Sequence, residues 1–200
     1  MFTQSAIDIF HRSIADYHLR NDVDTPISNP YVEGSIENLL YLKNWIDTVQ
    51  WHLEDIIRDP DISPEKALAL KHRIDSSNQD RTDLVEKIDD WFMASCKDVP
   101  LEDGASMNTE TPAWAIDRLS ILSLKIYHMK EESERESATP EHREKCREKL
   151  SVLLDQNKDL SSAIETLLED LQSGRKYMKL YRQMKMYNDP STNPVLYKKG

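Results

Sequence analysis

Apolar side chains recur along most of the chain at intervals of three and four residues, which is the spacing of one face of an α-helix. Three of the segments that show this pattern begin with a Ser or Thr followed directly by Pro, at Ser63, Thr111 and Thr139. A Ser or Thr side chain caps an unpaired backbone N–H, and Pro at the first helical position already has a helical φ. The predicted helices span 5–19, from Asn29 or Ser35 to about 58, 63–94, 111–134 and 139–174. The pattern therefore predicts an all-α fold, an antiparallel bundle of about five long helices.

The fifth predicted helix carries the longest periodic pattern, in which steps of three and four alternate as in a heptad repeat. The repeating positions form a seam: Cys146, Leu150, Leu153, Asn157, Leu160, Ile164, Leu167 and Leu171. A single Asn in such a seam fixes register or partner number in coiled coils. The favoured interpretation is that the seam packs inside the chain's own bundle, and the alternative is a homo-oligomer. Gly174 ends the pattern.

The residues after Gly174 differ in charge from the rest of the chain. They hold seven Lys or Arg against Asp189, a net charge of +6, so the preceding part carries −16 of the total of −10. We expect a bundle over 1–174, and over 175–200 a basic C-terminal helix reaching about Tyr187 followed by an extended tail. An acidic body attracts a basic tail, which predicts docking on the bundle. The alternative is a tail reserved for an anionic partner.

Composition narrows the class of protein. Only 4 of 200 residues are Gly, which is typical of helical rather than turn-rich β folds. A net charge of −10 opposes general nucleic-acid binding. Cys96 and Cys146 form no C-x-x-C motif, which suits a reducing compartment. No apolar run reaches the ~18 residues of a membrane span, and no secretory signal opens the chain. These features predict an acidic cytoplasmic protein with no transmembrane segment.

Polar residues interrupt the apolar stripe of the third predicted helix. Asn78 and Arg81 fall on the stripe between Ile74 and Val85. An unpaired buried charge costs several kcal/mol. We therefore expect either a carboxylate or an anionic ligand to meet Arg81.

The second predicted helix has an apolar face that includes Leu42, Ile46 and Val49, and an opposite side where Trp51 stands among acids and amides. A Trp in that setting indicates that this side is also covered. If the second and third helices pair about a turn near Asp61, three pairs lie at equal height. These pairs are Asn44 with Asn78, Asp47 with Asp75, and Tyr41 with Arg81.

The fourth predicted helix has two apolar stripes, which is typical of a central helix, so Asp117 and Arg118 should be at least partly buried. Together these patterns predict one interhelical polar cluster that binds a small anionic ligand, for which a phosphorylated compound is a candidate. The alternative is a buried hydrogen-bonded network that fixes helix register. The candidate ligand-binding residues are Tyr41, Asn44, Asp47, Trp51, Asp75, Asn78, Arg81, Asp117 and Arg118.

Metal-binding patterns are weak. His52 stands close to Glu54 and Asp55, and His72 precedes Asp75 by three residues, but no H-E-x-x-H motif occurs. His11 and His18 are predicted to lie at the boundary of the first helix's stripe. No cofactor is predicted, and the weak metal candidates are Glu33, Glu37, Glu54 and Asp55.

Magnesium enters through one alternative, the all-helical nucleoside triphosphate pyrophosphatases. They bind Mg²⁺ through E-x-x-E followed by E-x-x-D on adjacent helices. Glu33 and Glu37 are one residue too far apart for the first motif, and Glu86 with Asp89 supplies the second. No nucleophile or phosphate-loop motif stands out. Whether the chain is an enzyme or a scaffold without catalysis therefore stays open.

Four stretches, residues 41–55, 75–81, 112–119 and 185–190, carry a resemblance. They resemble a bacterial family catalogued only as a domain of unknown function, and the similarity extends over nearly the whole chain. The resemblance implies a bacterial, mostly helical, cytosolic protein. It implies no activity and no catalytic residue.

Overall fold

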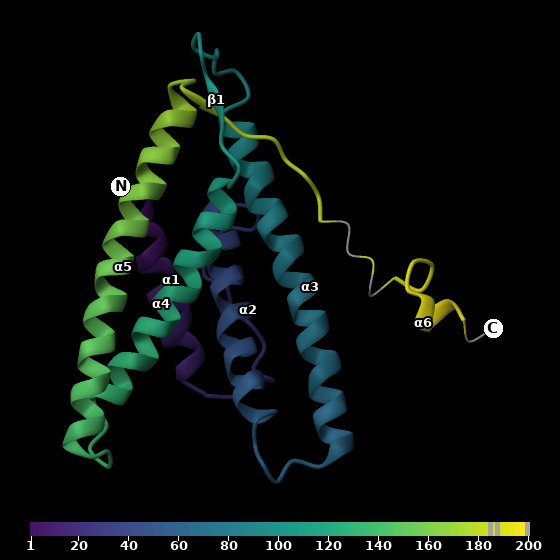
Figure 1. Ribbon diagram of the computed structural model, residues 1–200, viewed down its shortest axis with the longest axis vertical. Helices are drawn as coiled ribbons and strands as arrows, with labels where there is room; N and C mark the ends of the chain where they lie inside the picture. The colour runs from purple at the N-terminus through teal and green to yellow at the C-terminus, as the bar shows by residue number, and fades with distance from the viewer. Residues whose placement is uncertain (184–185, 187–188, 199–200) are drawn as a thin grey trace.

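The computed structural model describes residues 1–183, 186 and 189–198 (Figure 1). Five long helices account for most of these residues, which confirms the predicted all-α bundle. The elements in order are α1 (Phe2–His18), α2 (Ile36–Ile56), α3 (Pro64–Ser95), β1 (Ser106–Met107), α4 (Pro112–Glu134), α5 (Pro140–Gln172), β2 (Lys176–Tyr177) and α6 (Pro194–Tyr197). Among the described residues, no helix is both long enough and apolar enough to cross a membrane.

The helix starts follow from capping. Ser63, Thr111 and Thr139 each accept a hydrogen bond from the backbone N–H three residues further on, at the starts of α3, α4 and α5. The helix α2 begins at the later of its two candidate starts, because the side chain of Ser35 accepts from the N–H of Asn38. Each cap satisfies one of the donors that a helix N-terminus leaves unpaired.

Two helical hairpins form the bundle (Figure 1). The helices α2 and α3 are joined by residues 57–63, α4 and α5 are joined by residues 135–139, and α1 packs on α2 and α4. The helix α4 contacts all four other long helices. Its central position was predicted from its two apolar stripes and is confirmed. The core gathers Phe10, Tyr41, Ile88, Ile116 and Leu119 from four helices.

The seam on α5 packs mainly against α4. Ile164, Leu167 and Leu171 are buried in the chain's own core, so the favoured interpretation of the seam is confirmed for this half of the helix. The middle of the seam is less covered, and Leu153 and Leu160 are half-buried. This half-buried part lies between the buried side chains of Cys146 and Ile164.

The chain leaves α5 at a glycine that the structure requires. Gly174 has a φ of 77°, and a Cβ there would lie 2.1 Å from the carbonyl oxygen of Pro100. Beyond it, β2 pairs in parallel with β1, with Lys176 opposite Ser106. The close approach at Pro100 lets the end of α5 lie against the loop that holds β1.

The predicted basic helix after residue 174 is wrong for residues 175–183. They form β2 and an extended segment in which Met178 is buried and Arg182 contacts Glu86 and Asp90 of α3. Pairing with β1 supplies backbone hydrogen bonds at β2, and further on the N–H of Gln183 donates to the Glu86 side chain. Lys185 and Tyr187 lie outside the described residues, and the division of the chain at residue 174 stays a prediction.

Candidate functional site

A charged side chain lies in the centre of the bundle. Lys43 of α2 is fully buried, and its Nζ forms ion pairs with Asp47 and, at 2.8 Å, with Oδ1 of Asp117 on α4. Ser120 donates to Oδ2 of Asp47 at 2.6 Å, and Asn44 donates to the Ser120 hydroxyl at 3.0 Å. Buried charges persist in proteins when paired and hydrogen-bonded in this way. Burial raises the pKa of Asp47, although Lys43 and Ser120 act in the opposite direction.

Arg81 of α3 completes this group from the third helix. Its Nη1 donates to both carboxylate oxygens of Asp117, at 3.0 and 3.2 Å. The prediction that a carboxylate meets Arg81 is confirmed, and the side chain is 24% exposed. Its Nε, by contrast, is buried and has no hydrogen-bond partner among the residues that the structure describes. We call these side chains the Lys43 network: Lys43, Asn44, Asp47, Arg81, Asp117 and Ser120.

A pocket of about 470 Å³ opens beside the network between α2, α3 and α4. Trp51 forms part of its wall, and Arg81 reaches it from α3. We call it the Arg81 pocket. Its lining residues are Asp47, Gln50, Trp51, Glu54, Asp55, Arg58, Arg81, Ile121 and Leu124. Three of the candidate ligand-binding residues, Asp47, Trp51 and Arg81, therefore line one cavity.

The predicted register between α2 and α3 is wrong. Asn78 accepts a hydrogen bond from Gln50, not from Asn44, which instead donates to Ser120. The shift along α2 is six residues, from 44 to 50. With Gln50 opposite Asn78 and equal rise on both helices, the end of α2 lies level with residue 72 of α3. The first two turns of α3 therefore extend past the end of α2. The prediction had instead assumed a turn centred near Asp61, about which the two helices pair symmetrically.

Of the six candidate residues that do not line the pocket, Asn44 and Asp117 belong to the Lys43 network and Asn78 contacts the lining residue Gln50, whereas the other three do neither. Asp75 is partly exposed and pairs with Lys71 on its own helix, rather than with Asp47. Tyr41 is buried on the α1 side of α2, where its hydroxyl donates to Asp16 at 2.8 Å. It does not lie opposite Arg81.

Arg118 is the third, and its predicted burial is wrong. Its side chain is 60% exposed and pairs with Glu110 at 3.0 Å. On a helix, neighbouring residues point about 100° apart, so Asp117 faces the core while Arg118 faces outward.

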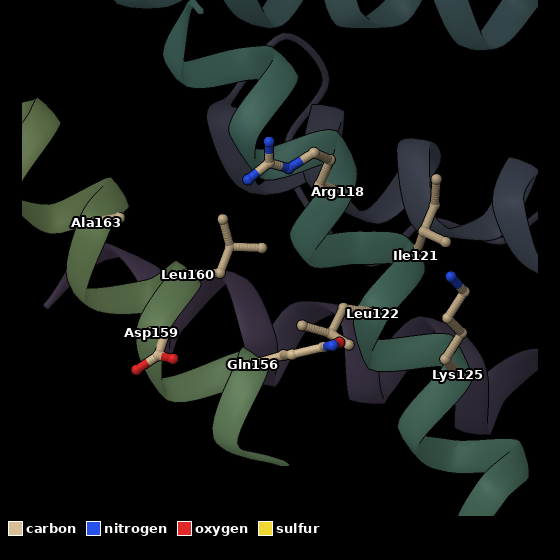
Figure 2. Close-up of a pocket in the computed structure, with 8 residues that line it drawn as sticks. All are labelled: Arg118, Ile121, Leu122, Lys125, Gln156, Asp159, Leu160 and Ala163. Atoms are coloured by element: carbon tan, nitrogen blue, oxygen red, sulfur yellow. The ribbon is translucent and has the colours of Figure 1, made fainter. Parts of the chain in front are cut away.

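Arg118 instead lines an open groove of about 580 Å³ between α4 and α5 (Figure 2). Leu122 of α4 and Leu160 of α5 project between the two helices, and Asp159 lies along its α5 side (Figure 2). The polar side chains around this groove lie near solvent, so the Arg81 pocket is the better candidate for specific recognition.

Lys43 itself was missed by the sequence analysis, although Trp51 had indicated that the side of α2 with Asn44 and Asp47 is covered. Leu42 and Ile46, assigned to the main apolar face of α2, are half-buried, whereas Lys43 and Thr48 are fully buried. Hydrophobicity assigns Lys to solvent by default. The available signal was Trp51 among polar residues together with the i,i+4 spacing of Lys43 and Asp47.

The acids proposed as weak metal ligands do not gather. Glu33 and Glu37 are exposed, Glu54 pairs with Arg58, and Asp55 lies 3.8 Å from Nδ1 of His52. In the described part of the chain, the one group of three His, Cys, Asp or Glu placed to hold a metal ion contains none of these acids. It consists of His18, His52 and His128.

The E-x-x-D pair of the pyrophosphatase alternative, Glu86 and Asp89, makes other contacts within the protein. Glu86 contacts Arg182, and Asp89 is buried. Burial raises the pKa of Asp89, with Thr111 and Ala113 as opposing hydrogen-bond partners. These contacts give the magnesium alternative no support.

The fold and the cluster define this protein as an all-α bundle with a buried charged network and a pocket between its helices. The chain belongs to the family described as "Protein of unknown function (DUF4254)", whose model matches residues 37–180. This confirms the resemblance to an uncharacterised, mostly helical family. No curated protein and no solved structure matches the chain. A bacterial origin and a cytoplasmic location stay predictions.

Proposed function

We propose that this protein binds a small organic acid or phosphate in the Arg81 pocket. The observation that carries the proposal is that Arg81 lines the pocket while its buried Nε lacks a partner among the described residues. A buried donor without an acceptor costs about 1–3 kcal/mol. An acceptor oxygen supplied by a ligand would remove that cost.

The guanidinium of Arg81 is held so that one edge is available. Its Nη1 is occupied by Asp117, while Nε and Nη2 donate to no described residue. The Nε and Nη2 protons are nearly parallel, so this edge matches the two oxygens of a carboxylate or phosphate. Lys43 lies behind Asp117 and fixes the carboxylate that orients Arg81.

The remaining walls suggest what else the ligand carries. Trp51, Ile121 and Leu124 supply apolar surface, which suits a ring or a short hydrocarbon body. Two of the pocket's three acids have cationic partners, since Glu54 pairs with Arg58 and Asp47 pairs with Lys43, and the third, Asp55, lies 3.8 Å from Nδ1 of His52. A cavity of about 470 Å³ suits a ligand of metabolite size.

Thermal-shift and calorimetric titrations with inorganic phosphate, benzoate and phenyl phosphate test this proposal, with benzyl alcohol as the neutral control. We expect the acids to raise the melting temperature and phenyl phosphate to bind most tightly. Arg81→Lys keeps the charge but removes the fork, so it should weaken binding about 10- to 100-fold, the range for charge-assisted hydrogen bonds.

Arg118→Lys is the matched control, because Arg118 stands outside the pocket and should leave binding unchanged. Binding of the acids to Arg81→Lys with wild-type affinity would overturn the proposal, and so would the absence of any shift in the wild type.

A scaffold function is the alternative, and the half-buried middle of the α5 seam favours it. Leu160 of this seam is half-buried in the groove of Figure 2. Self-association there predicts a dimer in sedimentation experiments that Leu160→Asp converts to a monomer. A monomeric wild type would reject self-association.

A further inference from the structure

Three histidine side chains from three helices converge on one point. His18 is the last residue of α1, His52 lies in α2 and His128 lies in α4, and one ring nitrogen of each lies within 4.8 Å of the other two. The ring centroids are 5.3, 5.5 and 5.5 Å apart, and the ring planes cross at 81°, 80° and 80°. The rings therefore surround a common centre with nearly threefold spacing.

The two nitrogens of each ring have different surroundings. Nδ1 of His18 is bonded to the side-chain oxygen of Asn21, and Nδ1 of His128 to Glu131 at 2.9 Å. Nδ1 of His52 lies 3.8 Å from Asp55. All three Nε2 atoms, in contrast, are buried with no hydrogen-bond partner among the described residues. A neutral imidazole that donates through Nδ1 presents a lone pair at Nε2.

Each ring is also held on one face by an aromatic side chain. Tyr127 stacks on His18 with centroids 4.7 Å apart, Tyr17 stacks on His52 at 4.9 Å, and Trp51 stacks on His128 at 4.9 Å. The interplanar angles are 14°, 11° and 13°. All three rings are thus fixed on a face, and those of His18 and His128 also on an edge through Nδ1, which is how outer-shell groups orient metal-binding histidines.

We propose that His18, His52 and His128, the histidine trio, bind one transition-metal ion of the Zn²⁺ class through their Nε2 atoms and leave a further coordination position open. Imidazole nitrogen suits Zn²⁺, Cu²⁺, Ni²⁺ and Co²⁺, whereas Mg²⁺ requires oxygen ligands. Three protein ligands with an open fourth position are typical of catalytic rather than structural zinc sites. Tetrahedral Zn–N bonds place the nitrogens about 3.4 Å apart, so the site closes by roughly an ångström on loading.

The charges around the trio suit a cation. Asp55 and Glu131 face the rings and supply negative charge against a bound ion.

The trio and the Arg81 pocket are neighbours, although the metal site does not depend on the pocket. Trp51 stacks on His128 and also lines the pocket, and Asp55 lies near His52 and lines it too. An acid held by Arg81 would therefore lie close to the metal. Arg81→Lys should leave metal binding unchanged, which separates the two proposals.

Calorimetric titration of chelator-treated full-length protein with Zn²⁺ tests the site, together with Co²⁺ absorption spectroscopy. We expect one ion per chain, the visible bands of a low-coordinate nitrogen-ligated Co²⁺ site, and no competition from excess Mg²⁺. A wild type with a helical circular-dichroism spectrum that binds neither ion would overturn the proposal.

Variants assign the ligands. His128→Gln and, independently, His18→Gln at the end of α1 should each weaken Zn²⁺ binding by more than about 100-fold, since losing an outer-shell partner alone costs about 10- to 100-fold. Glu131→Gln, which alters only such a partner, should fall within that lower range.

His142→Ala is the matched control. Nε2 of His142 lies 3.4 Å from Sγ of Cys146, so these two side chains form an alternative nitrogen–sulfur pair for a metal ion. The His142→Ala variant should bind Zn²⁺ like the wild type. Loss of binding in His142→Ala, or unchanged binding in either glutamine variant of the trio, would show that the ion binds elsewhere.

Discussion

The Lys43 network and the histidine trio are both polar groups packed between helices, and both include residues of α2 and α4. In the network, opposite charges meet, so that Lys43 contacts both Asp47 and Asp117. In the trio, three like groups meet, one ring nitrogen of each lies within 4.8 Å of the others, and no Nε2 atom has a hydrogen-bond partner among the described residues. A buried charge paired with an opposite charge is already stabilised, whereas convergent polar atoms without partners are costly unless a further component meets them. This difference is why we propose a structural role for the network and a binding role for the trio.

Arg81 lies at the boundary between these two kinds of region. Its Nη1 belongs to the network through Asp117, while its Nε has no partner in the described part of the chain, and the residue lines the Arg81 pocket. Under the proposed function, the network fixes the geometry of the side chain that meets the ligand. Rigid support behind a binding group limits the conformational entropy lost on binding.

The largest effect should come from the centre of the network. Lys43→Met keeps most of the side-chain volume but leaves Asp47 without its cation and Asp117 with Arg81 alone. Breaking a buried ion pair in this way costs about 3–5 kcal/mol. Urea denaturation of the wild type and the variant measures the difference in the free energy of unfolding. A loss below about 1 kcal/mol would mean that the network is not structural.

A smaller effect is expected from the trio. His128→Gln, measured in chelator, loses the stack on Trp51 and the bond to Glu131. Each such contact contributes about 1 kcal/mol, and the substitution also removes an unpaired buried nitrogen, so the net loss should stay near or below about 1 kcal/mol.

Adding Zn²⁺ should distinguish the histidine trio further from the Lys43 network. Excess Zn²⁺ should raise the stability of the wild type, because a ligand specific to the folded state adds RT ln(1 + [L]/Kd). It should have no such effect on His128→Gln. A destabilisation by His128→Gln as large as that of Lys43→Met would place the trio with the structural network instead.

The smallest effect should come from a residue that the sequence placed in the cluster and the structure does not. Asp75 pairs with Lys71 at the surface, and exposed pairs of this kind contribute about 0–1 kcal/mol. Asp75→Ala should therefore change the free energy of unfolding by less than about 0.5 kcal/mol and leave phenyl phosphate titrations unchanged. Weakened phenyl phosphate binding would return Asp75 to the site and restore the predicted register.

Much of the candidate site was visible in the sequence as individual residues. Arg81 on an apolar stripe predicted a buried partner, and Trp51 among acids predicted a covered face, because both conflict with the free energy of solvation. Their partners were not predicted correctly. The pairing of α2 with α3 depends on how residues 57–63 turn, and an error of six residues moved Asn44, Asp75 and Tyr41 away from their assigned positions.

The histidine trio shows the limit more clearly. His18, His52 and His128 are far apart in the chain and follow no metal-binding spacing. Taken alone, His18 was predicted only to lie at the boundary of the first helix's apolar stripe. Only the packing of α1 on α2 and α4 brings the three rings together.

The sequence by itself determined the helices, because capping and periodicity act over a few neighbouring residues and are written in each segment. It also determined that Arg81 needs a counter-charge. The tertiary structure alone decided which residues meet between helices: Lys43 with Asp117, and three histidines around one centre. Such contacts depend on the register and rotation of whole helices, which are set by the packing of many side chains together rather than by any local signal.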